Sequence, residues 1–226
     1  MISTYKTNPG LQQVLLQNMT SAQVQPGQVR DSLQLLNSVA QARAGYSTIS
    51  ANGARLNNIG RTLRESAGQK AYEGFQSAIR QSVDSADSLK SVRLINSIDI
   101  AVSGNVEATG ELFAGMAELS GEKEAGLFEN FNSALTSVIE KAGVGGLPPF
   151  SEVFSKVAAV EDEDAGGSRS QNLAKLFSAV RAVSREAASG EETVSNLKHL
   201  AEGVEISKQS RELWTYFDDF IGPDPT

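Results

Sequence analysis

Apolar residues recur at every third or fourth position along most of this chain, and that spacing predicts amphipathic helices. The longest such stripe begins shortly after Gly27. Several successive steps of four exceed the spacing of a left-handed coiled coil, so we expect straight or slightly right-handed packing. The stripe consists of Leu33, Leu36, Val39, Ala40, Ile49, Leu56, Ile59, Leu63, Ala67, Ala71, Phe75, Ile79, Val83 and Ala86.

The second half of the chain predicts several separate helices. Apolar spacing places two of them at about 107–119 and 124–142. The glycines and prolines of 143–149 should end the second helix, because glycine suits the C-terminal turn and proline cannot continue it. Ser151 is then predicted to cap a short helix that reaches residue 160.

Two further helix starts can be predicted from local chemistry. Ser168 with Gln171 and Ser189 with Glu192 both have the spacing of a capping box, ahead of apolar residues at helical spacing. We therefore expect helices to begin at both serines. A short helix near 11–19 is also expected from its leucine and valine spacing.

No stretch alternates apolar and polar residues over five or more positions, so no strands are predicted. We expect an all-α protein: an elongated multi-helix bundle with long helices in the N-terminal half and several shorter helices after residue 104. Because aromatic residues make up only 6% of the sequence, the core should be thin and packed by many close helix contacts rather than a few large side chains. The expected organisation is a polar, partly disordered leader at 1–29, a main helical bundle at 30–142, C-terminal helices at 150–221 that pack on the same bundle, and a tail at 222–226.

Glycines recur within the long N-terminal stripe at intervals of about two helical turns. One interpretation is close helix packing, in which they line one helix edge and let a partner helix approach. The alternative is that some of them mark helix ends, with Ser66-Ala67-Gly68 the strongest candidate for a break. The glycines predicted for close packing are Gly45, Gly53, Gly60 and Gly68, and Gly74 continues the series.

Charge is divided unevenly along the chain, whose formal net charge is −7. Residues 30–93 contain nine basic and five acidic residues, a net +4, whereas residues 99–164 contain thirteen acidic and three basic residues, a net −10. This division could hold two helical layers of one molecule together, pair unlike halves of neighbouring subunits, or reflect solvated faces that differ. The acidic total and the modest basic stretch argue against a nucleic-acid partner.

The sequence contains no signature of catalysis, and we expect no enzyme, metal or cofactor. There is no cysteine and a single histidine, His199, so a zinc site cannot be assembled. The acidic run from Asp162 fails as a calcium loop, because Leu173 stands where a bidentate glutamate is required. No segment approaches the ~20 apolar residues of a membrane span.

Aromatic residues gather near the C-terminus. Trp214, Tyr216, Phe217 and Phe220 lie within a short segment, and several can share one helix face. They are predicted to bind a partner, because tryptophan and tyrosine are enriched among interface anchors. The alternative is a C-terminal helix that packs these rings onto the protein's own core.

Residues 1–29 contain no acidic residue, and the first is Asp31. Together with the absence of cysteine and the Ala-, Ser-, Asn- and Gln-rich helices, this start gives the chain a composition that resembles helical proteins exported by flagellar or type III secretion systems. The resemblance is one of composition, and no motif assigns the chain to a named family. It implies release without a cleaved signal peptide; a cytoplasmic location is the alternative.

The leading hypothesis is therefore a non-enzymatic helical structural or interaction protein, which acts by protein contacts or self-assembly. Its sharper version is an exported bacterial component of a secretion system or appendage. The alternative is an intracellular adaptor or regulatory bundle that docks a partner through its aromatic C-terminus.

Overall fold

The computed structural model describes residues 52–84, 88–119, 126–160, 168–210, 216–217 and 220–221. All regular structure in these residues is helical, which confirms the predicted all-α multi-helix bundle. The expected leader, the helix near 11–19, Gly45 and Trp214 lie outside the described residues. In chain order the elements are α4 (Gly53–Ser66), α5 (Gln69–Asp84), α6 (Ser88–Gly104), α7 (Val106–Glu118), α8 (Leu127–Ala142), the 3₁₀ turn η1 (Gly143–Gly146), α9 (Leu147–Ala158), α11 (Arg169–Glu186) and α12 (Gly190–Ser210).

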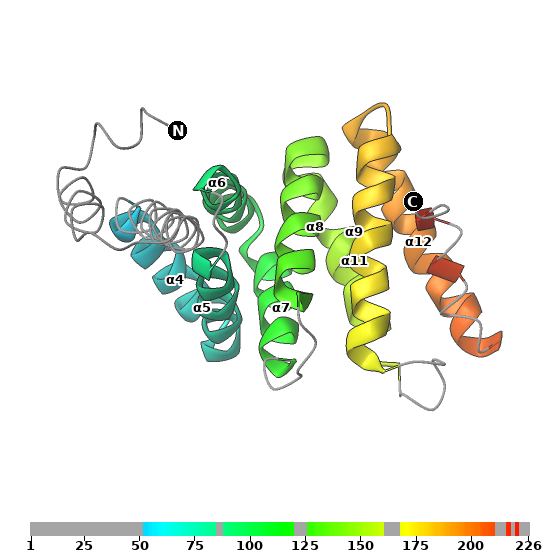
Figure 1. Ribbon diagram of the computed structural model, residues 1–226, viewed down its shortest axis with the longest axis horizontal. Coiled ribbons are helices and arrows are strands. Elements are labelled where there is room, and N and C mark those ends of the chain that lie inside the picture. Colours follow the sequence, from blue (N-terminus) through cyan, green and yellow to red (C-terminus); the bar gives the residue numbers. More distant parts are fainter. Residues whose placement is uncertain are drawn as a thin grey trace, which may run out of the picture.

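The described helices stack in two rows. One row contains α5, α7, α9 and α12, each packed against the next, and the other contains α4, α6, α8 and α11. The stack extends along the long axis of the molecule from α4 and α5 at one end to α12 at the other (Figure 1). Helix pairs that stack in this way bury a continuous core between the rows.

The predicted distribution of helix lengths is wrong for the described residues. The longest helices, α11 with 18 residues and α12 with 21, both follow residue 104. The part of the N-terminal stripe that the structure describes is instead divided into α4 with 14 residues and α5 with 16. The division occurs at Gly68, whose φ of 92° lies in the left-handed region that favours glycine.

Local capping chemistry predicted several helix ends correctly. Ser168 and Gln171 form a complete capping box at the start of α11. At the start of α12 the Glu192 backbone N–H donates to Ser189 Oγ, and the Glu192 carboxylate accepts from the Ala188 N–H. These reciprocal bonds satisfy backbone groups that have no partner within the helix.

The predicted start at Ser151 is wrong, because α9 begins four residues earlier, at Leu147. Pro148 and Pro149 lie in its first turn, where no backbone N–H is needed and the fixed φ of proline suits a helix. Ser151 is buried inside the helix, and its hydroxyl donates to the Glu111 carboxylate of α7 over 2.7 Å.

Phenylalanine rings form the centre of the core, contrary to the expectation of few large side chains. Phe75 of α5 packs edge-on against Phe113 of α7, which packs against Phe131 of α8. Phe131 in turn contacts Phe177 of α11 and Phe150 of α9. This phenylalanine cluster, completed by Phe154, links five helices from both rows. Alanines are buried around it, so the core combines large rings with close helix contacts.

A buried amide ties the two rows together. Asn132 of α8 is 8% exposed, and its side-chain N–H donates to the backbone carbonyl of Ala78 in α5 over 3.1 Å. The Asn132 Oδ1 atom is buried without a hydrogen-bond partner. An apolar side chain at this position would avoid the cost of burying an unpaired oxygen. The hydrogen bond of the amide forms only when Asn132 lies beside the Ala78 carbonyl, so it favours one register between α5 and α8.

Candidate interaction surfaces

Ion pairs join the basic and acidic parts of the chain within one molecule. Each of the cross-helix pairs among the described residues takes its cation from residues 52–93 and its carboxylate from residues 99–140, and each joins neighbouring helices of one row. The charges therefore pair within one molecule, as the first of the three interpretations expected, but they join helices of the same row and not the two layers. The pairs are Arg55–Asp99 at 2.6 Å, Lys70–Glu118 at 2.6 Å, Lys90–Glu129 at 3.8 Å and Arg93–Glu140 at 2.7 Å.

The Lys70–Glu118 pair shifts the ionisation of both partners. The hydrogen bond from Lys70 lowers the pKa of Glu118, and the attraction of the two charges lowers it further. The same bond and attraction raise the pKa of Lys70. Both side chains are well exposed, so this is a surface ion pair and not a catalytic arrangement of perturbed groups.

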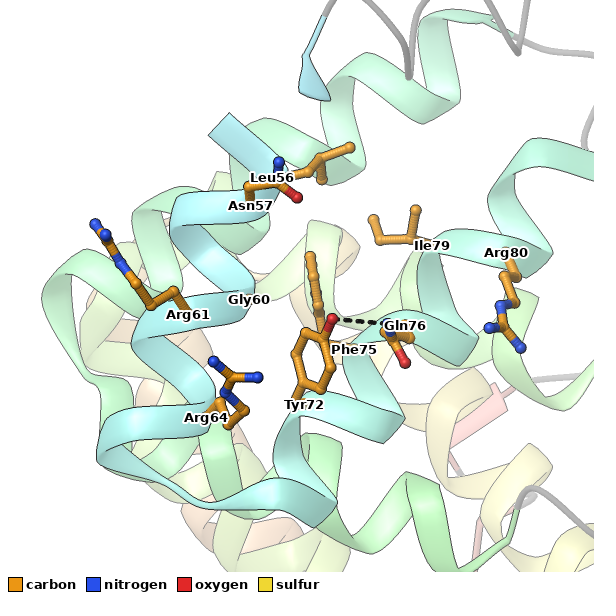
Figure 2. Close-up of a pocket in the computed structure, with 10 residues that line it drawn as sticks. All are labelled: Leu56, Asn57, Gly60, Arg61, Arg64, Tyr72, Phe75, Gln76, Ile79 and Arg80. Atoms are coloured by element: carbon orange, nitrogen blue, oxygen red, sulfur yellow. Dashed lines mark hydrogen bonds between the residues drawn. The ribbon is translucent and has the colours of Figure 1, made fainter. Parts of the chain in front are cut away.

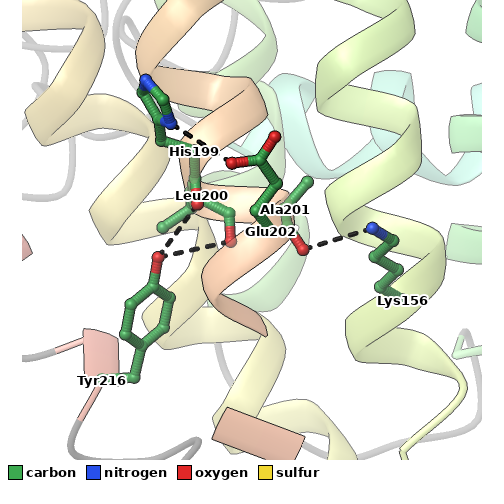
Figure 3. Close-up of polar contacts among 6 residues, drawn as sticks. All are labelled: Lys156, His199, Leu200, Ala201, Glu202 and Tyr216. Atoms are coloured by element: carbon green, nitrogen blue, oxygen red, sulfur yellow. Dashed lines mark hydrogen bonds and ion pairs between the residues drawn. The ribbon is translucent and has the colours of Figure 1, made fainter. Parts of the chain in front are cut away.

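The structure gives the C-terminal aromatic residues different environments. Phe217 is fully buried in the protein's own core, so it is not accessible as the predicted partner anchor while this segment is docked. Phe220 is half-buried, and its ring packs against Tyr216 with the centroids 5.1 Å apart. Tyr216 is also half-buried, and its hydroxyl donates to the backbone oxygens of His199 and Leu200 in α12 (Figure 3). The segment therefore packs on α12, as the alternative interpretation expected.

The glycines predicted for close packing also differ from one another. Gly60 is buried, and a Cβ atom there would lie 2.9 Å from Cε2 of Tyr72, so α4 and α5 do approach closely at this point. Gly53 begins α4 with open space around it, and Gly68 ends the turn before α5, so neither contributes a close helix contact. The tightest contact involves Gly74, where a Cβ atom would overlap the backbone carbonyl of Phe113.

Helix α6 presents apolar side chains to solvent. Leu89 is 73% exposed, Val92 38% and Ile100 49%. Their spacing of three and eight residues places them on one helix face. The opposite face carries Leu94, Ile95, Ile98 and Val102, all of which are buried.

This α6 face continues onto the adjoining 3₁₀ turn. Val144 of η1 is 36% exposed and lies directly against Gly104 at the end of α6. The sequence did not single out this helix, because apolar residues on both of its faces obscure the helical period. The signal that could have revealed it is that Ser88–Gly104 has no continuous polar face.

A groove of about 410 Å³ lies between α4 and α5 at one end of the stack. Its apolar floor includes Leu56, Phe75 and Ile79, and Tyr72 forms one wall. Arg61, Arg64 and Arg80 are among the residues that line it, and in Figure 2 the Arg64 side chain extends toward Tyr72 while Arg61 and Arg80 extend outward from the rim. The guanidinium carbon of Arg64 lies 5.7 Å from the centre of the Tyr72 ring, which places this charge over the aromatic face.

A second, narrower groove of about 200 Å³ lies between α6 and α8. Its lining is mostly polar, and the ion pairs of Arg93 with Glu140 and Lys90 with Glu129 cross it. Because its carboxylates are held by these cations, this groove offers no carboxylate pair arranged for acid–base chemistry.

No group of three His, Asp or Glu side chains in the described part of the chain is arranged to hold a metal ion. His199 is exposed, and its Nδ1 lies 3.3 Å from a Glu202 carboxylate oxygen on the same helix (Figure 3). Among the described helices, none combines the length and apolar character that crossing a bilayer requires. Comparison with protein-family models, curated proteins and solved structures gave no match for this chain.

Proposed function

We propose that this protein is a non-enzymatic helical interaction protein that binds another protein through the exposed apolar face of α6. The observation that carries the proposal is the exposure of three large apolar side chains on the outer face of α6, where they stand among the polar residues Arg93 and Asn96. A surface helix normally presents mainly polar side chains to water, so several large apolar side chains on one exposed face are a candidate contact surface. Leu89, Val92 and Ile100 therefore supply the kind of surface that a protein partner would cover.

The sharper form of this proposal is an exported bacterial component of a secretion system or appendage. Its support is compositional: an acid-free start, no cysteine, and helices rich in small and amide side chains. Removal of residues 1–29 should abolish release from the native cell and leave the stability of the helical stack unchanged. Release of the truncated chain at the normal rate would contradict export through this segment.

The intracellular adaptor is less well supported, because its proposed docking element is engaged within the protein. Phe217 is fully buried, and the Tyr216 hydroxyl bonds to α12. Tyr216 and Phe220 remain half-exposed, so only these two described rings could contribute to a partner contact without undocking.

A site-specific crosslinking experiment tests the role of α6. A photoreactive residue at Val92 of the full chain should capture a protein partner in the native cell, and Leu89→Ser with Ile100→Ser should abolish that capture. Because Leu89 is largely exposed and Ile100 is half-exposed, the serine variant should keep a melting temperature close to that of wild type. The matched control, Leu89→Met with Ile100→Val, should retain capture. Equal capture by the serine variant would refute the α6 proposal.

A further inference from the structure

We infer that the groove between α4 and α5 receives the acidic outer face of α12 from a second copy of this chain, which joins copies head to tail. The inference rests on the proposed function in one respect, because it also treats the protein as one that acts by protein contacts. It uses a different surface, however, so the two can fail separately.

The arginines around the groove differ from the other cations of this region in having no ion pair with a carboxylate among the described residues. Among the described basic residues of 52–93, Arg55, Lys70, Lys90 and Arg93 each face a carboxylate of a neighbouring helix. The other three are Arg61, Arg64 and Arg80, and they all line this groove. Arg61 donates to Asn58 and Arg64 lies over Tyr72, so neither contact neutralises a charge.

The apolar floor of the groove indicates which side chain the partner surface should carry besides its carboxylates. Leu56, Phe75 and Ile79 offer an apolar surface between the arginines, and the absence of a side chain at Gly60 lets Tyr72 approach α4. An exposed aliphatic side chain with carboxylates on either side would fill the floor and pair with the rim. Both kinds of contact favour association, the apolar contact by burial and the ionic contact by complementary charge.

Helix α12 presents this combination. Ile206 is 70% exposed and is one of the few large apolar side chains that the described helices present to solvent. Glu205 is its neighbour and Glu202 lies one turn earlier, and both are exposed. Glu202 also contacts His199, and Lys198 is exposed on the same face, so the two glutamates outweigh one lysine there. Spacings of three and four residues place Glu202, Glu205 and Ile206 on one helix face.

The groove and this acidic face of α12 belong to opposite ends of the stack (Figure 1). They therefore cannot meet within one molecule. A contact between unlike surfaces of two copies leaves one groove and one α12 face unoccupied, so the association can propagate into a chain or close into a ring. Because ionic contacts surround the interface, added salt should weaken it.

Charge exchange between two variants gives a decisive test. The groove variant carries Arg61→Glu and Arg80→Glu, and the helix variant carries Glu202→Arg and Glu205→Arg, each in the full chain. In sedimentation velocity at low salt, wild-type protein should show a sedimentation coefficient that rises with concentration. Each variant alone should associate at least about tenfold more weakly, because like charges then face each other.

An equimolar mixture of the two variants should recover association, since the reversed groove matches the reversed helix and the two unchanged surfaces match each other. Ile206→Ser should weaken wild-type association without changing the melting temperature. The control variant, Arg181→Glu with Arg185→Glu on α11, changes net charge by the same amount as the groove variant and should associate like wild type. A wild-type protein that stays monomeric at high concentration and low salt, or a mixture that stays monomeric while wild type associates, overturns the inference. Both outcomes leave capture through α6 to be decided by its own experiment.

Discussion

Gly74 of α5 lies directly against the backbone carbonyl of Phe113 in α7, so these two helices touch through their main chains at this point. No side chain larger than hydrogen fits between them. The contact brings Phe75 and Phe113 edge to face, with ring centroids 5.9 Å apart, and so connects α5 to the phenylalanine cluster. A helix-interior glycine costs up to about 1 kcal/mol relative to alanine, and this close approach offsets that cost.

Gly74→Ala should therefore destabilise the protein. The added methyl group meets a backbone carbonyl, which cannot rotate away, and overpacking of this kind costs about 1–3 kcal/mol. Urea denaturation followed by circular dichroism measures the change in the free energy of unfolding. The matched control is Gly53→Ala, where open space surrounds the helix start and no loss is expected. Equal effects at the two positions would contradict the proposed close contact.

Phe217→Ala should lower stability by about 3–5 kcal/mol, as expected for a fully buried phenylalanine. The measurement is again the free energy of unfolding, and it separates core packing from partner binding at this position. Tyr216→Phe removes only a hydroxyl whose bonds are 3.3 and 3.4 Å long, and it should cost less than about 1 kcal/mol. A Phe217→Ala variant that melts like wild type would mean that the C-terminal segment is not docked.

Asn132→Ala should cost about 1–3 kcal/mol, because it removes the buried hydrogen bond to the Ala78 carbonyl and opens a small gap between α5 and α8. Asn130 lies on the same helix but is only partly buried, so Asn130→Ala should change stability by less than about 0.5 kcal/mol. Thermal unfolding of both variants beside wild type gives the comparison. Similar losses for the two variants would argue against a role for the buried amide.

Lys70→Met should raise the pKa of Glu118 toward its ordinary value, because it removes the hydrogen bond and the charge that lower it most, while the charge of Arg169 remains. A carboxylate with a lowered pKa stabilises the fold above its unfolded pKa, and this contribution is lost as the pH falls through the folded value. The raised pKa of Lys70 acts at the other end of the scale, where its contribution is lost as the pH rises through the folded value. Carbon-detected NMR titration of the Glu118 carboxyl measures the first shift.

High salt provides an internal check on that titration. Because the pair is exposed, 1 M salt should reduce the shift of Glu118 in wild-type protein and leave the Lys70→Met variant nearly unchanged. A Glu118 pKa that is insensitive to both the substitution and salt would mean that the ion pair does not persist in solution.

The sequence predicted features that depend on neighbouring residues. The capping box at Ser168, the Ser189 cap and the end of α8 at Ala142 are local, because the groups that satisfy each helix end lie within a few residues of it. The uneven distribution of charge along the chain also indicated contacts between distant residues, because the cation of each cross-helix pair precedes residue 94 and its carboxylate follows residue 98.

Features that depend on the packing of distant helices could not be predicted. Helix α6 escaped notice because Leu89 and Ile100 on its outer face mask the period of the buried residues opposite. The importance of Gly74 over Gly53 depends on where α7 crosses α5, which spacing within one helix does not specify. The sequence offered Ser66-Ala67-Gly68 as the strongest candidate for a break, and the structure has the turn there, but the groove depends on how α4 and α5 then pack side by side.

The phenylalanine cluster determines which spectroscopic probes can follow the unfolding of this protein. Phenyl rings emit weakly, and the only indole in the sequence is Trp214, in the C-terminal segment. None of the buried core side chains among the described residues is a tryptophan. Indole fluorescence should therefore follow the surroundings of the C-terminal segment, while the near-ultraviolet dichroism of the phenyl rings should follow the interior of the stack.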